Sequence, residues 1–352
     1  MSQFVQLTIK SITPQTEQAI CIAFDLTPEQ QQRFQYQPGQ HLTIRHLTES
    51  GEIRRCYSIC SDVQEDMSIA IKKIDQGQFS TWANDNLKAG DQLEVMPPQG
   101  IFFQKVAKTG GKNYLGFAAG SGITPILSII KTVLLQQQAA SFTLIYGNRT
   151  WKQTMFAEQI MDLKDRFKER FQLINVFSRE MNDSALFNGR IDAEKLQLLF
   201  KANLIYAEFD HCFACGPNEM MEAVETVLPE FGIERSKIHT ERFNTGAVKK
   251  ATAQHIGNRN EEKVNIVLDE RELIIEVAKE DDSILDAALR AGADLPYACK
   301  GGVCATCKCK VLEGKVEMAI NYSLEPEELA KGYVLSCQAL PTTPNVRLSF
   351  DE

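Results

Sequence analysis

Hydrophobic and polar positions follow three different rhythms along the chain. Up to about residue 105, apolar and polar residues alternate in short runs such as FVQLTI, AICIAF and MSIAIKK, and turn-forming stretches separate these runs. Alternation with a period of two is typical of half-buried strands. Several short strands without a long helix predict a small antiparallel β-barrel over residues 1–106.

The pattern changes near residue 112, where the apolar stretches NYLGFAAG, SFTLIYG, FQLINVFS and CFACG are each followed by a helical pattern. Strands that alternate with helices predict a parallel sheet covered by helices, here over residues 107–245. Residues 246–262 are polar and nearly free of large apolar side chains, which favours a linker. Two strand-like runs and the short helix SILDAALRAG open a third domain over residues 263–352.

Charge and hydropathy narrow the class of protein. The net charge of −8 gives no support to nucleic-acid binding. From residue 263 onward, 16 acidic residues face 10 basic ones, so the third domain is an acidic module with its own docking surface. No uninterrupted apolar run is long enough for a membrane span, and the opening MSQFVQLTIK has no signal-peptide pattern. We therefore expect a cytoplasmic protein with reduced thiols, in which clustered cysteines indicate metal binding or redox chemistry.

Four cysteines of the third domain have the spacing of a metal site. Cys299, Cys304 and Cys307 stand at C-x4-C-x2-C, and Cys337 follows after 29 intervening residues. This is the plant-type ligand spacing of a [2Fe–2S] cluster. Structural zinc is the alternative, although only one C-x2-C pair is present. Cys309 would share a strand face with Cys307 and is expected to be core packing.

Two further regions carry candidate nucleotide contacts. In RRCYSIC, the side chains of Arg55, Tyr57 and Ser58 could clamp a pyrophosphate, cover a flavin ring and hydrogen-bond its edge, although an ordinary exposed strand would explain them nearly as well. Gly77 and Ser80 follow in a turn that could bind phosphate.

The stretch GSGITP lies between a buried strand and a helix. Gly120 and Gly122 would let a ligand approach the backbone, with Thr124 as N-cap of a helix whose N-terminus favours phosphate. Cys215 and Gly216 end another apolar strand, where open α/β sheets place ligands. Two arginines also follow strands and could bind a 2′-phosphate, which favours NADPH over NADH: Arg149 and Arg179.

In this order, the motifs R-x-Y-S, G-x-x-S, G-S-G-I-T-P and C-G-P resemble the ferredoxin–NADP⁺ reductase superfamily. With a C-terminal plant-type ferredoxin domain the chain looks like an oxygenase reductase, and stretches such as NYSLEPEELAKGYVLSCQALP resemble the reductases of ring 1,2-phenylacetyl-CoA epoxidation. The resemblance implies a β-grasp third domain and FAD rather than FMN. It makes Arg55, Tyr57 and Ser58 flavin contacts, and Gly77 and Ser80 phosphate contacts.

The resemblance also places Cys215 near the nicotinamide C4 in a positional role. It implies that Glu241 and Phe243 belong to the segment that closes over the flavin. The family turn often reads Gly-Gly where this chain has Gln76 and Gly77, which puts the backbone contact at residue 76 in doubt.

These cofactors form an electron chain. NADPH yields two electrons together as a hydride, whereas a [2Fe–2S] cluster takes one, so a flavin that accepts a pair and releases single electrons must stand between them. We therefore expect an NADPH-dependent reductase that needs no bond-breaking side chain and delivers electrons to the oxygenase subunits of a multicomponent di-iron monooxygenase. The alternatives are the reductase of another aromatic oxygenase and a zinc-carrying binding module.

Overall fold

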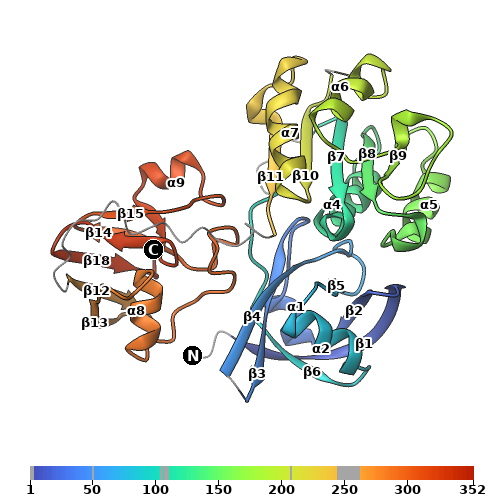
Figure 1. Cartoon of the computed structure of the whole chain (residues 1–352). Coiled ribbons are helices and arrows are strands. Elements are labelled where there is room, and N and C mark those ends of the chain that lie inside the picture. The colour runs from blue at the N-terminus through green and yellow to red at the C-terminus, as the bar shows by residue number, and fades with distance from the viewer. Residues whose placement is uncertain (1–3, 50, 104–105, 107–110, 207, 244–261) are drawn as a thin grey trace. The chain divides into compact units, whose positions relative to one another are not determined.

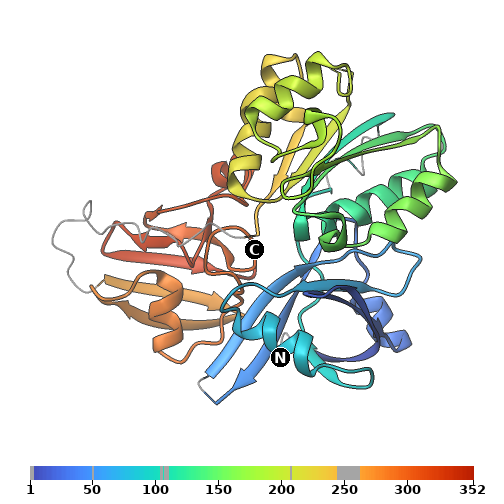
Figure 2. The same cartoon turned by 45° about the vertical axis from the view of Figure 1, so that its right-hand side comes forward.

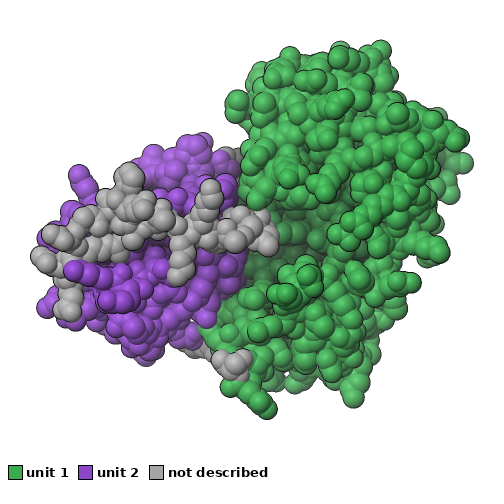
Figure 3. Space-filling view, viewed as in Figure 1, with its two compact units in different colours: residues 1–243 green, residues 244–352 purple. Residues whose placement is uncertain are grey.

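The computed structural model describes residues 4–49, 51–103, 106, 111–206, 208–243 and 262–352. The chain divides into two compact units, Met1–Phe243 and Asn244–Glu352 (Figure 3). The predicted linker therefore lies outside the described residues, except for Glu262. Within the described part of the chain, every helix is too short or too polar to span a bilayer.

The first unit begins with a six-stranded antiparallel sheet in the order β4-β3-β6-β1-β2-β5 (Figure 1). Its two edge strands meet through a bridge between Ile59 and Ile69, so the sheet closes on itself as a barrel. Alternate apolar side chains fill its interior, among them Leu7, Ile22 and Ile44. Strands β1 (Val5–Thr16), β2 (Ala19–Asp25), β3 (His41–Thr48), β4 (Gly51–Ser58), β5 (Ser68–Lys72) and β6 (Gln92–Val95) form it, with helices α1 (Pro28–Arg33) and α2 (Gln78–Asn86).

A five-stranded parallel sheet in the order β11-β10-β7-β8-β9 completes the first unit. Its strands are β7 (Asn113–Ala119), β8 (Ser141–Asn148), β9 (Phe171–Phe177), β10 (His211–Cys215) and β11 (Ile238–Glu241). Helices α6 (Ala193–Lys201) and α7 (Asn218–Glu230) cover one face, and α4 (Ile123–Gln136) and α5 (Ala157–Arg166) cover the other (Figure 2). Each face of the parallel sheet has its own hydrophobic core. Side chains of β7 alternate between these two cores, since Tyr114 packs on one face and Leu115 on the other.

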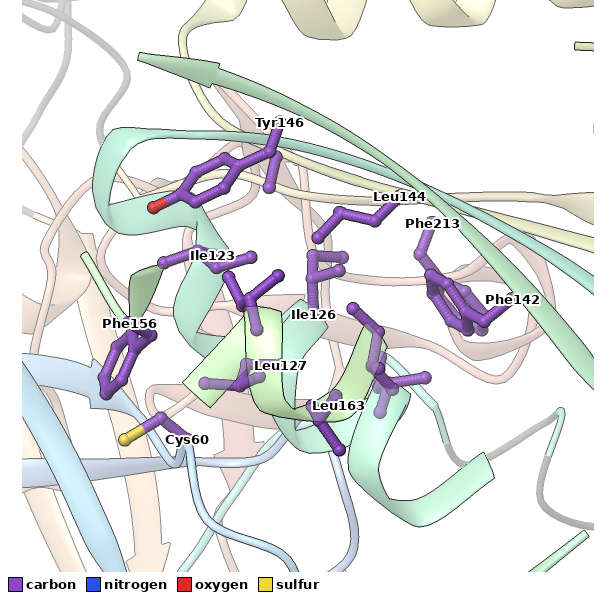
Figure 4. Packing of buried hydrophobic residues seen from close by; sticks show 14 of the residues in the cluster. Cys60, Ile123, Ile126, Leu127, Phe142, Leu144, Tyr146, Phe156, Leu163 and Phe213 are labelled. Carbon is purple, nitrogen blue, oxygen red and sulfur yellow. The ribbon is translucent and has the colours of Figure 1, made fainter. Parts of the chain in front are cut away.

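Helix α4 also contacts the barrel. It is apolar on nearly all sides, and twelve of its fourteen residues are buried. One core cluster joins Ile126 and Leu127 of α4, Tyr146 of β8 and the barrel residue Cys60 (Figure 4). Because a helix that is hydrophobic all round must be covered on all sides, α4 is packed between the parallel sheet and the barrel.

The second unit is a mixed five-stranded sheet, β13-β12-β18-β14-β16, with a separate pair β15-β17. The bounds are β12 (Glu262–Leu268), β13 (Arg271–Val277), β14 (Lys308–Glu313), β15 (Val316–Met318), β16 (Tyr333–Leu335), β17 (Ala339–Pro341) and β18 (Asn345–Ser349). Helices α8 (Ile284–Arg290) and α9 (Pro326–Ala330) pack beside them. As predicted, Ser283 is the N-cap of α8, and its hydroxyl oxygen accepts a hydrogen bond of 3.1 Å from the backbone amide of Asp286. The predicted antiparallel barrel and the predicted parallel α/β domain are both confirmed.

Candidate flavin, nicotinamide and cluster sites

The candidate flavin residues lie at the end of β4. Arg55 is exposed, Tyr57 is half-buried with its ring 5.7 Å from that of Phe79, and Ser58 is buried. Burial raises the pKa of the Tyr57 phenol, and the Arg55 guanidinium partly offsets this rise. A cation, an aromatic face and a hydroxyl on one strand suit the pyrophosphate, ring face and ring edge of a flavin.

The turn before α2 suits a phosphate. Gly77 precedes the helix, whose first turn has no side-chain cap. A Cβ at Gly77 would lie only 2.4 Å from Ser80 Oγ and from Ile74 Cγ1, so only glycine fits there. Gln76 has φ 56°, the left-handed conformation that glycine favours, so the backbone keeps its turn despite the departure at this position.

Glu241 reaches the flavin strand from the other domain. Ser58 Oγ donates to Glu241 Oε2 at 3.2 Å. Burial raises the pKa of the Glu241 carboxyl from 4.5 to about 7, with His41 and Ser58 acting in the opposite direction. Phe243, two residues further on, is 41% exposed. The Glu241 carboxyl can therefore hold a proton up to a pH near neutral.

The candidate nicotinamide site lies where β7 and β10 end. Cys215 is fully buried, and burial together with Glu241 raises the pKa of its thiol well above the ordinary value. A neutral thiol is a poor nucleophile, which agrees with a positional role. A Cβ at Gly122 would lie 2.0 Å from the Cys215 carbonyl oxygen, and one at Gly216 would lie 2.6 Å from Met220 Cε. Gly122 is therefore required where its backbone approaches the end of β10, whereas a side chain at Gly216 would have to displace the tip of Met220.

The predicted N-cap of α4 is wrong. The helix begins at Ile123 and its N-cap is Gly122, because a 3₁₀ turn over Gly120–Gly122 runs directly into it. Thr124 instead lies inside the first turn, buried, and its hydroxyl donates to the Ser121 carbonyl at 3.0 Å. The helix N-terminus has no side-chain cap, which leaves its dipole available to an anion.

The sequence interpretation missed Lys72, the last residue of β5. Its Nζ lies 3.3 Å from the position that a Cβ of Gly120 would occupy. Burial and the neighbouring Arg149 lower the pKa of the Lys72 ammonium. A cation beside a helix N-terminus suits a phosphate group. A lysine at the end of a strand could have been noticed, but its closeness to Gly120 depends on the packing of two domains.

The two predicted arginines are neighbours. Strands β8 and β9 are adjacent and parallel, and the Arg179 amide donates to the Arg149 carbonyl at 2.8 Å just beyond their ends. Both side chains are exposed. The structure therefore brings together the backbones of two arginines that lie 30 positions apart in the chain.

The four candidate metal ligands form two pairs. The Cys299 thiol contacts the Cys304 thiol, and the Cys307 thiol contacts that of Cys337. The pKa of Cys299 is raised, chiefly by Cys304 and then by burial. Two thiolates for each of two irons is the ligand set of a [2Fe–2S] cluster, so the residues fit this group.

The surrounding loop also supports a cluster. The Gly301 amide donates to Cys299 Sγ at 3.2 Å, and the Gln338 side-chain amide lies 3.7 Å from Cys337 Sγ. Donors to sulfur stabilise its charge and help to set the reduction potential. Cys309 lies on β14, 1% exposed within the core of the second unit, as expected for packing.

Comparison with known proteins agrees with this division into three sites. Family models match residues 6–103 as an oxidoreductase FAD-binding domain, 117–226 as an oxidoreductase NAD-binding domain and 266–342 as a 2Fe–2S iron–sulfur cluster binding domain. One component of the 1,2-phenylacetyl-CoA epoxidase of Escherichia coli K12 is 49% identical, over 100% of this chain and 99% of that protein. The chain belongs to the family of flavin- and [2Fe–2S]-containing reductases that includes this component. Its cofactors are FAD, a nicotinamide nucleotide and a [2Fe–2S] cluster.

Two other comparisons are more distant. The ferredoxin reductase component of a 3-ketosteroid-9-alpha-monooxygenase of Rhodococcus rhodochrous is 33% identical over 99% of this chain and 97% of that protein. The solved structure of phthalate dioxygenase reductase has a TM-score of 0.59 at 22% identity, covering 99% of this chain and 98% of that one. The second comparison supports the fold only.

Proposed function

We propose that the protein is the reductase component of a multicomponent oxygenase that epoxidises the ring of phenylacetyl-CoA. The observation that carries this proposal is the 49% identity to the Escherichia coli epoxidase component along the whole chain. The 33% identity to a steroid monooxygenase reductase makes a different oxygenase the weaker candidate. We infer that the acceptor in the partner is a di-iron centre.

When bound, FAD would accept an electron pair from the nicotinamide and the cluster would pass single electrons onward. The residues of this chain bind and orient these groups. Arg55, Tyr57 and Ser58 would hold the flavin, and Gly77 and Ser80 its phosphates. Cys299, Cys304, Cys307 and Cys337 would hold the two irons.

The nicotinamide nucleotide would bind along the ends of the parallel strands. Gly120, Gly122 and Thr124 form the turn where its pyrophosphate would meet the N-terminus of α4, and Cys215 with Gly216 would hold the nicotinamide in place. The neutral thiol of Cys215 and the Glu241 carboxyl, which keeps its proton up to about pH 7, reduce the charge of this buried region. Phe243 would cover the flavin.

We further propose that the donor is NADPH. Arg149 and Arg179 are neighbours at the backbone, and their guanidinium groups would bind a 2′-phosphate through charge-assisted hydrogen bonds. NADH has no such phosphate, so it would gain nothing from these two cations.

The experiment that tests this function is NADPH-driven turnover of phenylacetyl-CoA by this protein together with the purified oxygenase part of a phenylacetyl-CoA epoxidase. Formation of the ring epoxide that requires both this protein and NADPH would support the proposal. Reduction of an artificial dye without any epoxide, under conditions in which the Escherichia coli component does support turnover, would contradict the proposed partner.

A further inference from the structure

Helix α4 presents one polar stripe in an otherwise apolar surface. Ser128, Lys131 and Thr132 are buried, with exposed fractions of 0%, 7% and 6%. They stand at positions i, i+3 and i+4, which lie on one face of a helix. A buried polar side chain needs a hydrogen-bonding partner, so this face must meet a polar surface.

That surface is a single loop of the barrel, residues 61–65, which connects β4 to β5. Ser128 Oγ donates to the Ser61 carbonyl at 2.7 Å, and Thr132 Oγ1 donates to Asp62 Oδ2 at 3.0 Å. Lys131 Nζ lies 2.7 Å from Glu65 Oε2. We call these three contacts the α4 clamp.

The loop is itself fixed from the barrel side. Tyr36 Oη lies 2.8 Å from Ser61 Oγ and donates to the Asp62 carbonyl at 2.6 Å. The Asp62 amide donates to Glu65 Oε2 at 3.0 Å. The Glu65 carboxylate therefore accepts one hydrogen bond from its own loop and one from Lys131 of α4. A displacement of α4 along or around its axis would therefore strain bonds to a loop that Tyr36 holds to the barrel.

The apolar part of the same interface does not fix the helix in this way. Apolar contacts within the cluster that includes Cys60 and Leu127 are non-directional, and they tolerate a small shift of one surface over the other. Hydrogen bonds depend on distance and angle, and buried ones leave an unpaired group when they break. The α4 clamp therefore helps to define one register between the two domains, together with the hydrogen bonds that join Ser58 to Glu241 and Phe156 to Gln15.

Helix α4 and the loop 61–65, which the α4 clamp joins, are each close in sequence to one of the candidate sites. The N-terminus of α4 follows the Gly120–Gly122 turn, where the nucleotide pyrophosphate would bind. The loop 61–65 begins three residues after Ser58, at the end of the flavin strand. A displacement between the loop and α4 would therefore change the separation of nicotinamide and flavin.

We propose that Ser128, Lys131 and Thr132 are positioning residues for hydride transfer, which act by fixing the nicotinamide-binding helix against the flavin strand. The inference rests on the proposed transfer from NADPH to FAD. Because hydride transfer requires near-contact of donor and acceptor atoms, a displacement of about 1 Å lowers its rate by about 100-fold. Loosening the α4 clamp should lower the rate of transfer without weakening the contacts that bind NADPH within its own domain.

The test is anaerobic stopped-flow reduction of the purified holoprotein by NADPH, which separates the limiting rate of flavin reduction from the apparent dissociation constant for NADPH. Thr132→Val removes the hydroxyl but keeps the side-chain shape, and Thr132→Ser restores the hydroxyl. Thr143→Val is the matched control, because Thr143 is a buried threonine of the same domain whose hydroxyl contacts Gln172 on the adjacent strand. Lys131→Met is a second, independent variant.

We expect Thr132→Val and Lys131→Met to lower the limiting rate about 10-fold with an unchanged dissociation constant, while Thr132→Ser and Thr143→Val resemble the parent. In the flavin-free protein, amide hydrogen exchange over residues 61–65 should be faster in Thr132→Val and in Lys131→Met, and it should stay at the parent rate in Thr132→Ser and Thr143→Val. A parent-like limiting rate in both Thr132→Val and Lys131→Met, or an equal loss in Thr143→Val, would overturn the inference. If the parent holoprotein is not reduced by NADPH at all, it is the proposed function that fails.

Discussion

Ser58 and Glu241 share a hydrogen bond of 3.2 Å although 183 positions separate them in the chain. The register of β10 with β11 places Glu241 directly beside Cys215. The sequence predicts Ser58 as a flavin contact, Glu241 as part of the segment that closes over the flavin, and Cys215 as a residue that places the nicotinamide. The structure brings these three residues together at one point. This convergence supports the proposed direct transfer between the two nucleotides.

The raised pKa of Glu241 predicts a pH-dependent stability. Between pH 4.5 and about 7 the folded protein keeps a proton that the unfolded chain has lost, so stability falls as pH rises through this window and levels off above it. The fall for the flavin-free protein should be about 3 kcal/mol. Urea unfolding followed by tryptophan fluorescence measures it, since both tryptophans, Trp82 and Trp151, lie in the first unit.

The matched variant is Glu241→Gln, which keeps the size of the side chain and removes its titration. We expect the dependence of the unfolding free energy on pH to become nearly flat between about pH 5 and about pH 8. An equally steep dependence in the variant would show that another group is responsible.

Replacement of individual cysteines distinguishes ligands from packing. Cys304→Ser should abolish the iron–sulfur absorption yet leave NADPH-to-dye activity through FAD, because the flavin and nicotinamide sites lie in the other unit. Cys309→Ala should keep the cluster and lose only about 1 kcal/mol of stability through a small cavity. Iron content, visible spectra and dye reduction measure these outcomes.

A parent-like spectrum in Cys304→Ser would exclude the proposed ligand set of the cluster. Zinc in place of iron in the parent protein would support the alternative of a zinc-carrying binding module.

Gly122 is required by the backbone of the adjacent strand. In Gly122→Ala the new methyl group would lie 2.0 Å from the Cys215 carbonyl oxygen, so one backbone segment must move. We expect a loss of roughly 1–3 kcal/mol in stability and much weaker NADPH binding, with FAD content unchanged. In the control Gly147→Ala the new methyl group meets the flexible tip of Ile191 at 3.0 Å and should cost far less. Thermal unfolding and NADP⁺ titration compare the two, and equal losses would argue against the close approach at Gly122.

The two arginines should determine nucleotide preference. Arg149→Ala and Arg179→Ala each remove one cation from the proposed 2′-phosphate site, and each should raise KM for NADPH about 10-fold. KM for NADH should stay nearly constant, because NADH lacks the phosphate that these cations would bind. Steady-state dye reduction with both nucleotides measures the ratio. Equal effects on both nucleotides would refute the role in specificity.

Features fixed by local sequence were predictable. The cysteine spacing, the strand–helix alternation and the N-cap Ser283 depend on neighbours in the chain, and the structure shows the last two as expected. Residues that act through distant contacts were missed. Lys72 reaches Gly120 only after the two domains pack, and the stripe from Ser128 to Thr132 appears in the sequence as ordinary polar positions of a helix. Thr124 was misassigned as N-cap because sequence does not distinguish an N-cap from the first residues after a 3₁₀ turn.

The central claim is that NADPH, flavin and cluster form one electron path. Anaerobic titration of the holoprotein with NADPH, followed by visible absorption, tests it most directly. We predict that the flavin absorption bleaches first and the iron–sulfur absorption second, and that removing the flavin prevents the second change. A holoprotein whose spectrum does not respond to NADPH, or a cluster that NADPH reduces equally well without flavin, would contradict the account.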